Sequence, residues 1–443
     1  MTDAANDPAQ ESANDHDLLE LDIGPVAHGG WCVARHEGRV VFVRHTLPGE
    51  RVRARVTDET TSFLRADAVE ILTASPDRVP APCPFAGPGR CGGCDWQHAS
   101  LPAQRRLKAA VIEEQLSRLA GIERSVVVAE IPMPDDGVIT PPGLGWRTRV
   151  QFSVRNDGAI GLRRHRSHGI EPIDACLIAH PGIEEMGIER RRWPGAAGVE
   201  AVVSAATGDR VVLLPERRGK GRRSAKTPRL DVPVRLVRGR PEPGRALPYV
   251  REEVAGRLWQ VSGGGFWQVH PGAAQALADA VLAGLRPAPG EVALDLYCGA
   301  GLFAGVLGRA IGPDGLVVGV ESDGMAVRDA RFNLRDLPHV SVERGTVEDI
   351  LDELEFGTAD GGRIERADLV VLDPPRTGAG RAVVDRIAKV AGRAIAYVSC
   401  DPATFARDLA YFGALGWTVE TLRGFDAFPM THHMEILAVL VKA

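Results

Sequence analysis

The sequence predicts an α/β protein in which a Rossmann-like, doubly wound sheet near the C-terminus follows two β-rich regions. From about residue 266 onward, helical and strand patterns alternate, which is typical of a mostly parallel sheet with helices on both faces. Residues 19–73 and 145–265 instead alternate apolar and charged positions, the pattern of half-buried strands. The chain has 443 residues, too many for one ordinary core, so we expect separate domains.

Charge is distributed unevenly along the chain. The formal net charge is -5, but residues 1–22 hold seven acidic and no basic residues. We expect residues 1–18 to be a disordered acidic tail, because the segment is polar and charged. Without those seven acids the remaining chain would carry +2, with local basic runs. Such a balance suits a protein that docks on a polyanion such as RNA through patches.

The sequence also indicates where the protein works. No apolar run reaches the ~20 residues that cross a bilayer. The first residues lack the basic start and the apolar stretch of a signal peptide. We therefore expect a cytoplasmic protein. The seven cysteines are an odd number, which argues against a disulfide framework.

The first β-rich region, residues 19–73, reads as short strands separated by turns. Its length fits a small five-stranded barrel of the oligonucleotide-binding kind, although any small β-domain would give the same pattern. A helix is expected over residues 101–120, with Gly121 as its stop. Residues 216–229 hold seven basic residues, which indicates either a solvated loop or a contact to RNA phosphates.

Four of the cysteines are spaced like metal ligands. Two residues separate Cys91 from Cys94, and seven separate Cys83 from Cys91. Cys176 stands alone, far downstream. Four thiolates bind either one zinc ion or a four-iron, four-sulfur (4Fe–4S) cluster. Zinc sites usually contain a second close pair, so the isolated fourth cysteine favours iron–sulfur, with zinc second and unligated thiols as the remaining alternative.

A glycine turn follows the first strand of the predicted C-terminal sheet. Residues 295–301 (DLYCGAG) end an apolar strand and open a helix, and Gly299 and Gly301 let the backbone approach a ligand closely. Glu321 ends the next strand, where an acid can accept hydrogen bonds from two ribose hydroxyls. The dinucleotide fingerprint's third glycine is missing, which favours S-adenosylmethionine over NAD. The simpler alternative is a tight turn beside a surface acid.

Two further segments carry groups suited to methyl transfer onto a pyrimidine. Residues 373–376 (DPPR) follow an apolar strand, and Arg376 replaces the aromatic of amino methyltransferases, which argues against an exocyclic amine as the target. Cys400 ends the next strand, and a thiolate adding to carbon 6 of uracil would make carbon 5 nucleophilic. Glu435 offers a carboxylate to remove the carbon 5 proton. The alternatives are an inert buried thiol and a solvated surface acid.

Five short motifs together resemble the RNA 5-methyluridine methyltransferase family, whose members act on transfer or ribosomal RNA. The resemblance extends over about residues 20–443. The motifs are residues 266–270 (FWQVH), 295–302 (DLYCGAGL), 373–376 (DPPR), 399–402 (SCDP) and 433–435 (HME). The chain departs from the family's usual residue, without loss of a reacting group, at Trp267, His270, Leu302 and Asp401.

The resemblance implies a role for each candidate residue. Cys400 would be the nucleophile and Glu435 the base, and Phe266 and Arg376 would contact the target uridine. The residues expected to contact S-adenosylmethionine are Gln268, Tyr297, Gly299, Gly301, Glu321 and Asp373. A branch of the family carries an iron–sulfur cluster on three close cysteines and a distant one, which would be Cys83, Cys91, Cys94 and Cys176.

The resemblance also implies the order of the domains. It divides the chain into a TRAM-like, RNA-binding β-barrel over residues 19–74, a central domain with the cysteine cluster over 75–265, and a class I methyltransferase domain over 266–443. The predicted function is transfer of a methyl group from S-adenosylmethionine to carbon 5 of a specific uridine in ribosomal or transfer RNA. The alternatives are a methyltransferase acting on a base amine and a non-catalytic RNA-binding iron–sulfur protein.

Overall fold

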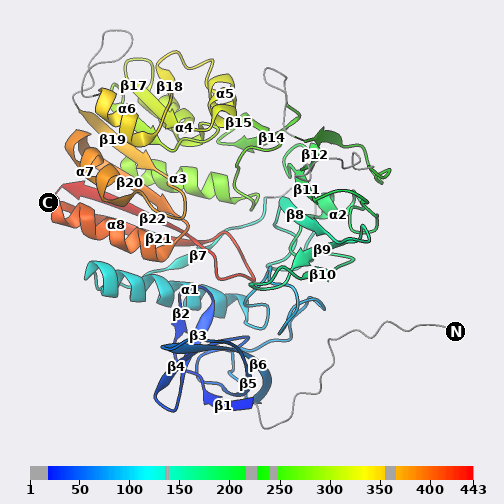
Figure 1. Ribbon diagram of the computed structural model, residues 1–443. Helices are drawn as coiled ribbons and strands as arrows, with labels where there is room; N and C mark the ends of the chain where they lie inside the picture. The colour runs from blue at the N-terminus through cyan, green and yellow to red at the C-terminus, as the bar shows by residue number, and fades with distance from the viewer. Residues whose placement is uncertain are drawn as a thin grey trace.

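The computed structural model describes residues 18–134, 137, 139–215, 227–239, 247–354 and 366–442. Within them the strands form two six-stranded sheets, one hairpin and one eight-stranded sheet (Figure 1). The predicted fold class, two β-rich regions followed by an α/β domain, is confirmed. The predicted acidic tail falls outside the described residues except for Leu18, and so do residues 216–226 of the basic stretch.

The N-terminal β-domain is a single sheet in the order β1-β5-β6-β4-β3-β2. Val41, Val43 and Val52 are fully buried at alternating positions, because successive residues of a strand point to opposite faces. The sheet has one strand more than the predicted five, since the two residues of β2 also pair with β3. The strands are β1 (Leu18–Asp22), β2 (Val26–Ala27), β3 (Trp31–His36), β4 (Arg39–Arg44), β5 (Arg51–Glu59) and β6 (Phe63–Thr73).

Residues 74–100, which include three of the candidate metal ligands, contain no helix or paired strand element, and a long helix follows them. The helix begins where Ser100 Oγ accepts a hydrogen bond from the backbone N–H of Ala103, the usual capping contact. It runs as α1 (Leu101–Gln115) and continues as η2 (Leu116–Ala120). Gly121 ends it in the left-handed conformation, so the expected helix over residues 101–120 is confirmed.

The central sheet has the order β10-β9-β8-β11-β12-β13 and carries its own apolar core, which includes Trp146, Phe152 and Trp193. The described part of this region also contains one short helix, α2 (Pro181–Glu184). The strands are β8 (Arg149–Val154), β9 (Ile160–Arg163), β10 (Ile170–Pro172), β11 (Gly198–Val203), β12 (Arg210–Leu214) and β13 (Arg235–Arg238).

The C-terminal sheet has the order β18-β17-β16-β19-β20-β22-β21-β7, with β16 to β20 parallel and β22 antiparallel to β20. Its strands are β7 (Val128–Glu130), β16 (Val292–Leu296), β17 (Leu316–Glu321), β18 (Val340–Arg344), β19 (Ala367–Leu372), β20 (Ala391–Ser399), β21 (Trp417–Asp426) and β22 (Glu435–Lys442).

Helices cover both faces of this sheet, each with a separate apolar core. One core contains residues of α3 (Ala273–Leu285), α4 (Leu302–Ile311) and α5 (Gly324–Asn333). The other contains residues of α1, α6 (Val347–Leu354), α7 (Gly380–Val390) and α8 (Pro402–Ala414). This arrangement is a doubly wound α/β sheet, in which ligands bind at the carboxyl ends of the parallel strands.

Three segments of the predicted central domain pack instead on the α/β unit. Helix α1 shares the core of α8, and β7 pairs with β21 at the sheet edge (Figure 1). The hairpin of β14 (Tyr249–Val254) and β15 (Arg257–Ser262) is tied to α5, because Asn333 Oδ1 accepts a hydrogen bond from Gln260 N at 2.8 Å. Helix α1, strand β7 and the β14–β15 hairpin therefore pack with the α/β domain, although the predicted boundary between residues 265 and 266 places them in the central domain.

Candidate functional site

The glycine turn after β16 has the geometry of a ligand cradle. Tyr297, Gly299 and Gly301 all have positive φ angles, of 65°, 54° and 90°. A Cβ added to Gly299 would meet nothing within 4 Å, so its backbone faces open space where a ligand can come close. A Cβ added to Gly301 would lie 2.9 Å from Leu334 Cδ1, so this glycine is needed for helix packing.

A cavity beside this turn brings together most of the predicted cofactor residues. Gln268, Tyr297, Gly299 and Asp373 line it, and so does Phe266, which the sequence assigns to the uridine. Phe266 is 68% exposed, so the structure leaves its ring free at the rim.

The remaining cofactor candidates, Gly301 and Glu321, do not line that cavity. Glu321 stands directly behind the turn, where Gly299 N donates to its Oε2 at 3.1 Å and Asp323 N donates to its Oε1 at 2.7 Å. Its carboxylate is therefore fixed by backbone amides at the tip of β17.

Asp295 is not among the predicted cofactor residues, and it does not line the cavity beside the turn. It is fully buried, and Ala304 N donates to its Oδ2 at 2.6 Å, but its Oδ1 has no hydrogen-bond partner. Burial raises the pKa of Asp295 to about 8. A buried polar atom without a partner is costly and indicates a missing ligand or water. An acid directly before the glycine turn was the signal available in the sequence.

Strand pairing brings Cys400 and Glu435 to the same sheet edge. Strands β20 and β22 are antiparallel, and Ser399 pairs with Ile436. Cys400 follows the first of these residues and Glu435 precedes the second, so the thiol and the carboxyl group meet across the two strands. The interaction is electrostatically strong enough for Glu435 to raise the pKa of Cys400.

Cys400 and Glu435 both have raised pKa values. Burial, reinforced by Glu435, raises the pKa of the Cys400 thiol to about 12, and Arg376 opposes the shift. Glu435 is only 4% exposed, and its Oε2 has no partner. Burial and nearby Asp373 raise the pKa of Glu435 well above its usual value. Burial and the nearby charges thus favour the neutral form of both groups.

A narrow cavity opens at Cys400, and its walls come from distant parts of the chain. Arg376, Cys400, Asp401 and Met434 line it together with His433. Burial lowers the pKa of His433 to about 3, so its ring is neutral and Nδ1 accepts a hydrogen bond from Arg376 Nη2 at 3.3 Å. Arg376 thus lies at the same cavity as the Cys400 thiol, and its contact with the uridine stays a prediction.

Other walls of this cavity were not predicted. They include His28 and Gly30 of the N-terminal β-domain and Trp96 of the cysteine-bearing segment. His432, which also lines the cavity, hydrogen-bonds through Nδ1 to Asp95 Oδ2 at 2.6 Å. Contacts between segments so far apart leave no periodic pattern of residues. These cavity residues therefore could not be predicted from the sequence.

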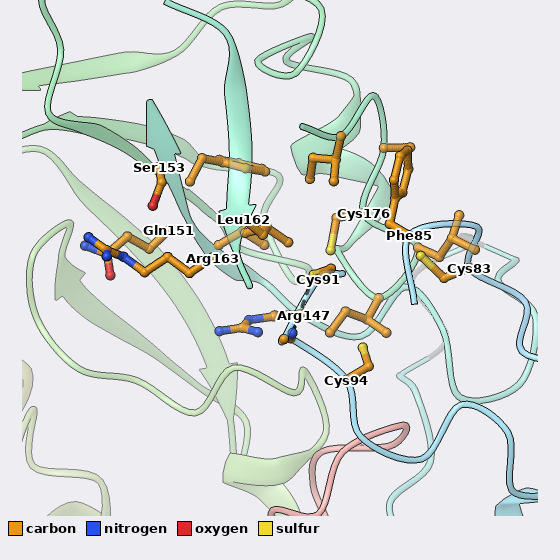
Figure 2. A pocket seen from close by; sticks show the side chains of 18 of the residues that line it. Cys83, Phe85, Cys91, Cys94, Arg147, Gln151, Ser153, Leu162, Arg163 and Cys176 are labelled. Carbon is orange, nitrogen blue, oxygen red and sulfur yellow. Dashed lines mark hydrogen bonds between the residues drawn. The ribbon is translucent and has the colours of Figure 1, made fainter. Parts of the chain in front are cut away.

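The four candidate metal ligands Cys83, Cys91, Cys94 and Cys176 line one cavity of about 500 Å³, distinct in its lining from that at Cys400 (Figure 2). Figure 2 shows the four thiols at this cavity, and Cys91 lies near enough to Cys176 to affect its pKa. Burial raises the pKa values of Cys94 and Cys176, and for Cys176 the charge of Arg147 opposes the shift.

The arrangement of these thiols does not support a single zinc ion. Zinc needs its sulfur ligands within about 2.3 Å of the metal. Among the described residues, no three His, Cys, Asp or Glu side chains are close enough together to hold one ion. The second expectation, zinc, is therefore not favoured. A four-iron cluster takes one cysteine per iron, and its presence here stays a prediction.

Comparison with known proteins gives two family matches. Residues 285–443 match the model of tRNA (uracil-5-)-methyltransferase, and residues 18–69 match the TRAM domain. No helix within the described residues has the length and apolar character to cross a membrane.

Relatives match along nearly the whole chain. An uncharacterized RNA methyltransferase of Streptomyces coelicolor is 54% identical, covering 96% of this chain and 93% of the relative. One from Bifidobacterium longum is 35% identical, covering 96% of each chain. The fold is similar to that of the crystal structure of Pyrococcus abyssi tRNA (uracil-54, C5)-methyltransferase in complex with S-adenosyl-L-homocysteine. That match has a TM-score of 0.66 and 20% sequence identity, and it covers 97% of this chain and 100% of the other chain.

Proposed function

Because the chain belongs to the RNA methyltransferases of the tRNA (uracil-5-)-methyltransferase family, we propose that it methylates carbon 5 of a specific uridine in ribosomal or transfer RNA. The observation that carries the proposal is the meeting of Cys400 and Glu435 across β20 and β22. An amine methyltransferase needs neither a thiol nor a base at this place.

The proposed reaction proceeds through a covalent bond to Cys400. Its sulfur bonds to carbon 6 of the uracil ring, and the electron pair moves to carbon 5, which takes the methyl group. Glu435 then removes the carbon 5 proton, and the bond between carbon 6 and sulfur breaks, which returns the thiolate. Arg376 lies where it favours the anionic sulfur.

S-adenosylmethionine fits the cavity beside the glycine turn, where Gln268, Tyr297, Gly299 and Asp373 would hold it. When bound, it supplies the methyl group together with a positive charge that favours ionised Cys400 and Glu435. The unpaired Oδ1 of buried Asp295 supports a polar ligand behind the turn. Similarity to a fold that binds S-adenosyl-L-homocysteine agrees with this assignment.

Deleting the gene should remove one 5-methyluridine from cellular RNA. Mapping 5-methyluridine in ribosomal and transfer RNA of the deletion strain would identify the site, and the wild-type gene should restore it. An unchanged map in both RNA classes would contradict the proposal. A Cys400→Ala gene is the matched control, because it should fail to restore the modification.

The methylation rate should rise with pH between about 7 and 9. Cys400 must be ionised to react, and its raised pKa keeps it protonated at low pH, so activity is lost as pH falls. Arg376→Ala should move the profile to higher pH and slow the reaction at pH 7, because the arginine lowers that pKa. Single-turnover rates at saturating RNA would measure this. Arg381→Ala, on α7, should leave the profile unchanged, and coincident profiles for Arg376→Ala and wild type would refute the effect.

We further propose that Cys83, Cys91, Cys94 and Cys176 hold a 4Fe–4S cluster. Their shared cavity supports this, and the reaction itself needs no redox step, so the cluster would be structural. Protein purified without oxygen should contain about four irons and four sulfides per chain.

A single ligand substitution tests the cluster. Cys91→Ser should lose most of the iron, whereas Cys32→Ala should keep it, because Cys32 is buried in the β-domain beside Thr46. Metal analysis and visible absorption would report the difference. Equal iron in both variants, or zinc in place of iron in the wild type, would count against the cluster.

A further inference from the structure

The turn between β2 and β3 is pressed against the reaction site. Gly29 and Gly30 have φ angles of 92° and 84°, and a Cβ on Gly30 would lie 3.1 Å from His432 Cβ and 3.3 Å from Asp95 Cβ. Trp96 Nε1 donates to the carbonyl oxygen of Gly30 at 3.3 Å. A side chain at Gly30 would be strained by this φ angle and would press on both neighbours, so the backbone of the N-terminal β-domain itself closes the cavity on this side.

His28 connects this turn to the loop that carries the nucleophile. Its Nε2 lies 3.3 Å from Oδ2 of Asp401, the residue after Cys400. Oδ1 of the same carboxylate accepts hydrogen bonds from Ala403 N at 3.1 Å and Thr404 N at 2.9 Å, which caps α8. One oxygen therefore fixes the start of the helix, and the other holds the β-domain.

The Asp401 carboxylate is charged under ordinary conditions. Burial opposes ionisation, but the hydrogen bonds from His28 and Thr404 lower its pKa to about 2. Thr404 Oγ1 also donates to the carbonyl oxygen of Arg376 at 3.0 Å. The contact with His28 thus belongs to a network that fixes the Cys400 loop relative to the strand end bearing Arg376.

A second contact ties the β-domain to the loop that leads to Glu435. Arg44 Nη2 lies 3.3 Å from Asp95 Oδ1, and Asp95 Oδ2 lies 2.6 Å from His432 Nδ1. Arg44 and Asp95 are both buried. The β-domain therefore contacts both segments that carry the reacting groups, and it does so from one side of the cavity.

The contact between His28 and Asp401 is better suited to holding the Cys400 loop in position than to stabilising the fold. The two side chains are 39% and 20% exposed, and ion pairs this accessible contribute little to folding. A target base must leave its stack to reach an enzyme nucleophile, so the walls of the receiving cavity set its alignment. In this protein the β-domain supplies one of those walls.

We propose that the N-terminal β-domain acts in the chemical step, with its turn at residues 28–30 as a wall of the uridine cavity and His28 as a positioning residue that holds the Cys400 loop through Asp401. The proposal rests on the proposed function. The β-domain would then do more than bind RNA, because the turn that belongs to this RNA-docking domain would also align the Cys400 thiol.

His28→Ala tests the proposal in the full chain. We expect the single-turnover rate of covalent adduct formation with 5-fluorouridine RNA to fall at least tenfold at saturating RNA. The RNA dissociation constant should stay within twofold of the wild-type value. The melting temperature should stay within about 1 °C of the wild-type value. His28→Gln, which can still donate to Asp401, should recover part of the rate. His36→Ala, at the end of β3 and away from the cavity lining, is the matched control.

A second measurement does not depend on uridine chemistry. Iodoacetamide should alkylate Cys400 several-fold faster in His28→Ala than in wild type or His36→Ala, since one wall is loosened. Peptide mass spectrometry would follow Cys400 alone. Unchanged adduct formation and alkylation would overturn the positioning role, and so would a loss confined to RNA affinity. If the wild type forms no adduct and no 5-methyluridine, the proposed function fails, and the alkylation rates still decide whether His28 holds the loop.

Discussion

Replacing Cys400 by alanine should abolish methylation, with a loss on the order of 10⁴-fold or more, as for the removal of other enzyme nucleophiles. Carbon 5 of uracil is a poor nucleophile until sulfur has added to carbon 6, so no slower path of the same kind remains. The variant should also form no denaturation-resistant complex with 5-fluorouridine RNA. Methyl transfer from radiolabelled S-adenosylmethionine and gel electrophoresis of the RNA complex would measure the two effects.

The control for this result is a thiol elsewhere in the chain. Cys32→Ala should keep full activity, because Cys32 lies in the β-domain core. S-adenosylmethionine should bind the Cys400→Ala protein as it binds wild type, because Cys400 does not line the cofactor cavity. Retained turnover in Cys400→Ala would remove the basis of the proposed mechanism and would favour methylation of a base amine.

Replacing Glu435 by glutamine should separate the two halves of the reaction. The thiol can still add and the methyl group can still move, but the carbon 5 proton stays in place, so the adduct cannot break down. We expect turnover to fall by about 10²- to 10⁴-fold, the usual contribution of a general base, while a methylated covalent complex accumulates on ordinary uridine RNA. Mass spectrometry of the trapped complex would show the added methyl group.

A matched acid distinguishes this effect from a general change in charge. Glu343→Gln, on exposed β18, should neither slow turnover nor trap RNA. Glutamine is close in size to the acid, and burial favours the neutral form of Glu435, so the fold should tolerate the change. Loss of turnover without any trapped complex would assign the carboxyl group to an earlier step.

The sequence predicted the parts of the site that lie along single strands. Strand tips followed by polar residues identified Gly299, Asp373 and Cys400, because a parallel sheet gathers its carboxyl ends at one edge. The positions of Gln268 and Tyr297 in the cofactor cavity agree with the family motifs. Their roles in binding and catalysis remain predictions.

Contacts between segments that lie far apart in the sequence could not be predicted. His28 and Gly30 reach Cys400 only because the N-terminal sheet docks beside α1 and the loop before β22. A boundary drawn at about residue 266, where the pattern changes to alternating helix and strand, leaves α1 and β7 in the central domain. Their apolar residues instead complete the α/β core, and local patterns do not show which of two neighbouring cores a helix will join.

The pairing of β7 with β21 limits how this enzyme can be divided. Residues 285–443 match a family model, yet the last strand of their sheet comes from residues 128–130. A fragment cut at residue 285 would present β21 as a bare edge and would uncover the apolar face beneath α1. Exposed edges and apolar faces of this kind recruit other chains. We therefore expect residues 285–443 to fold poorly alone, and a fragment that keeps the site should include α1 and β7.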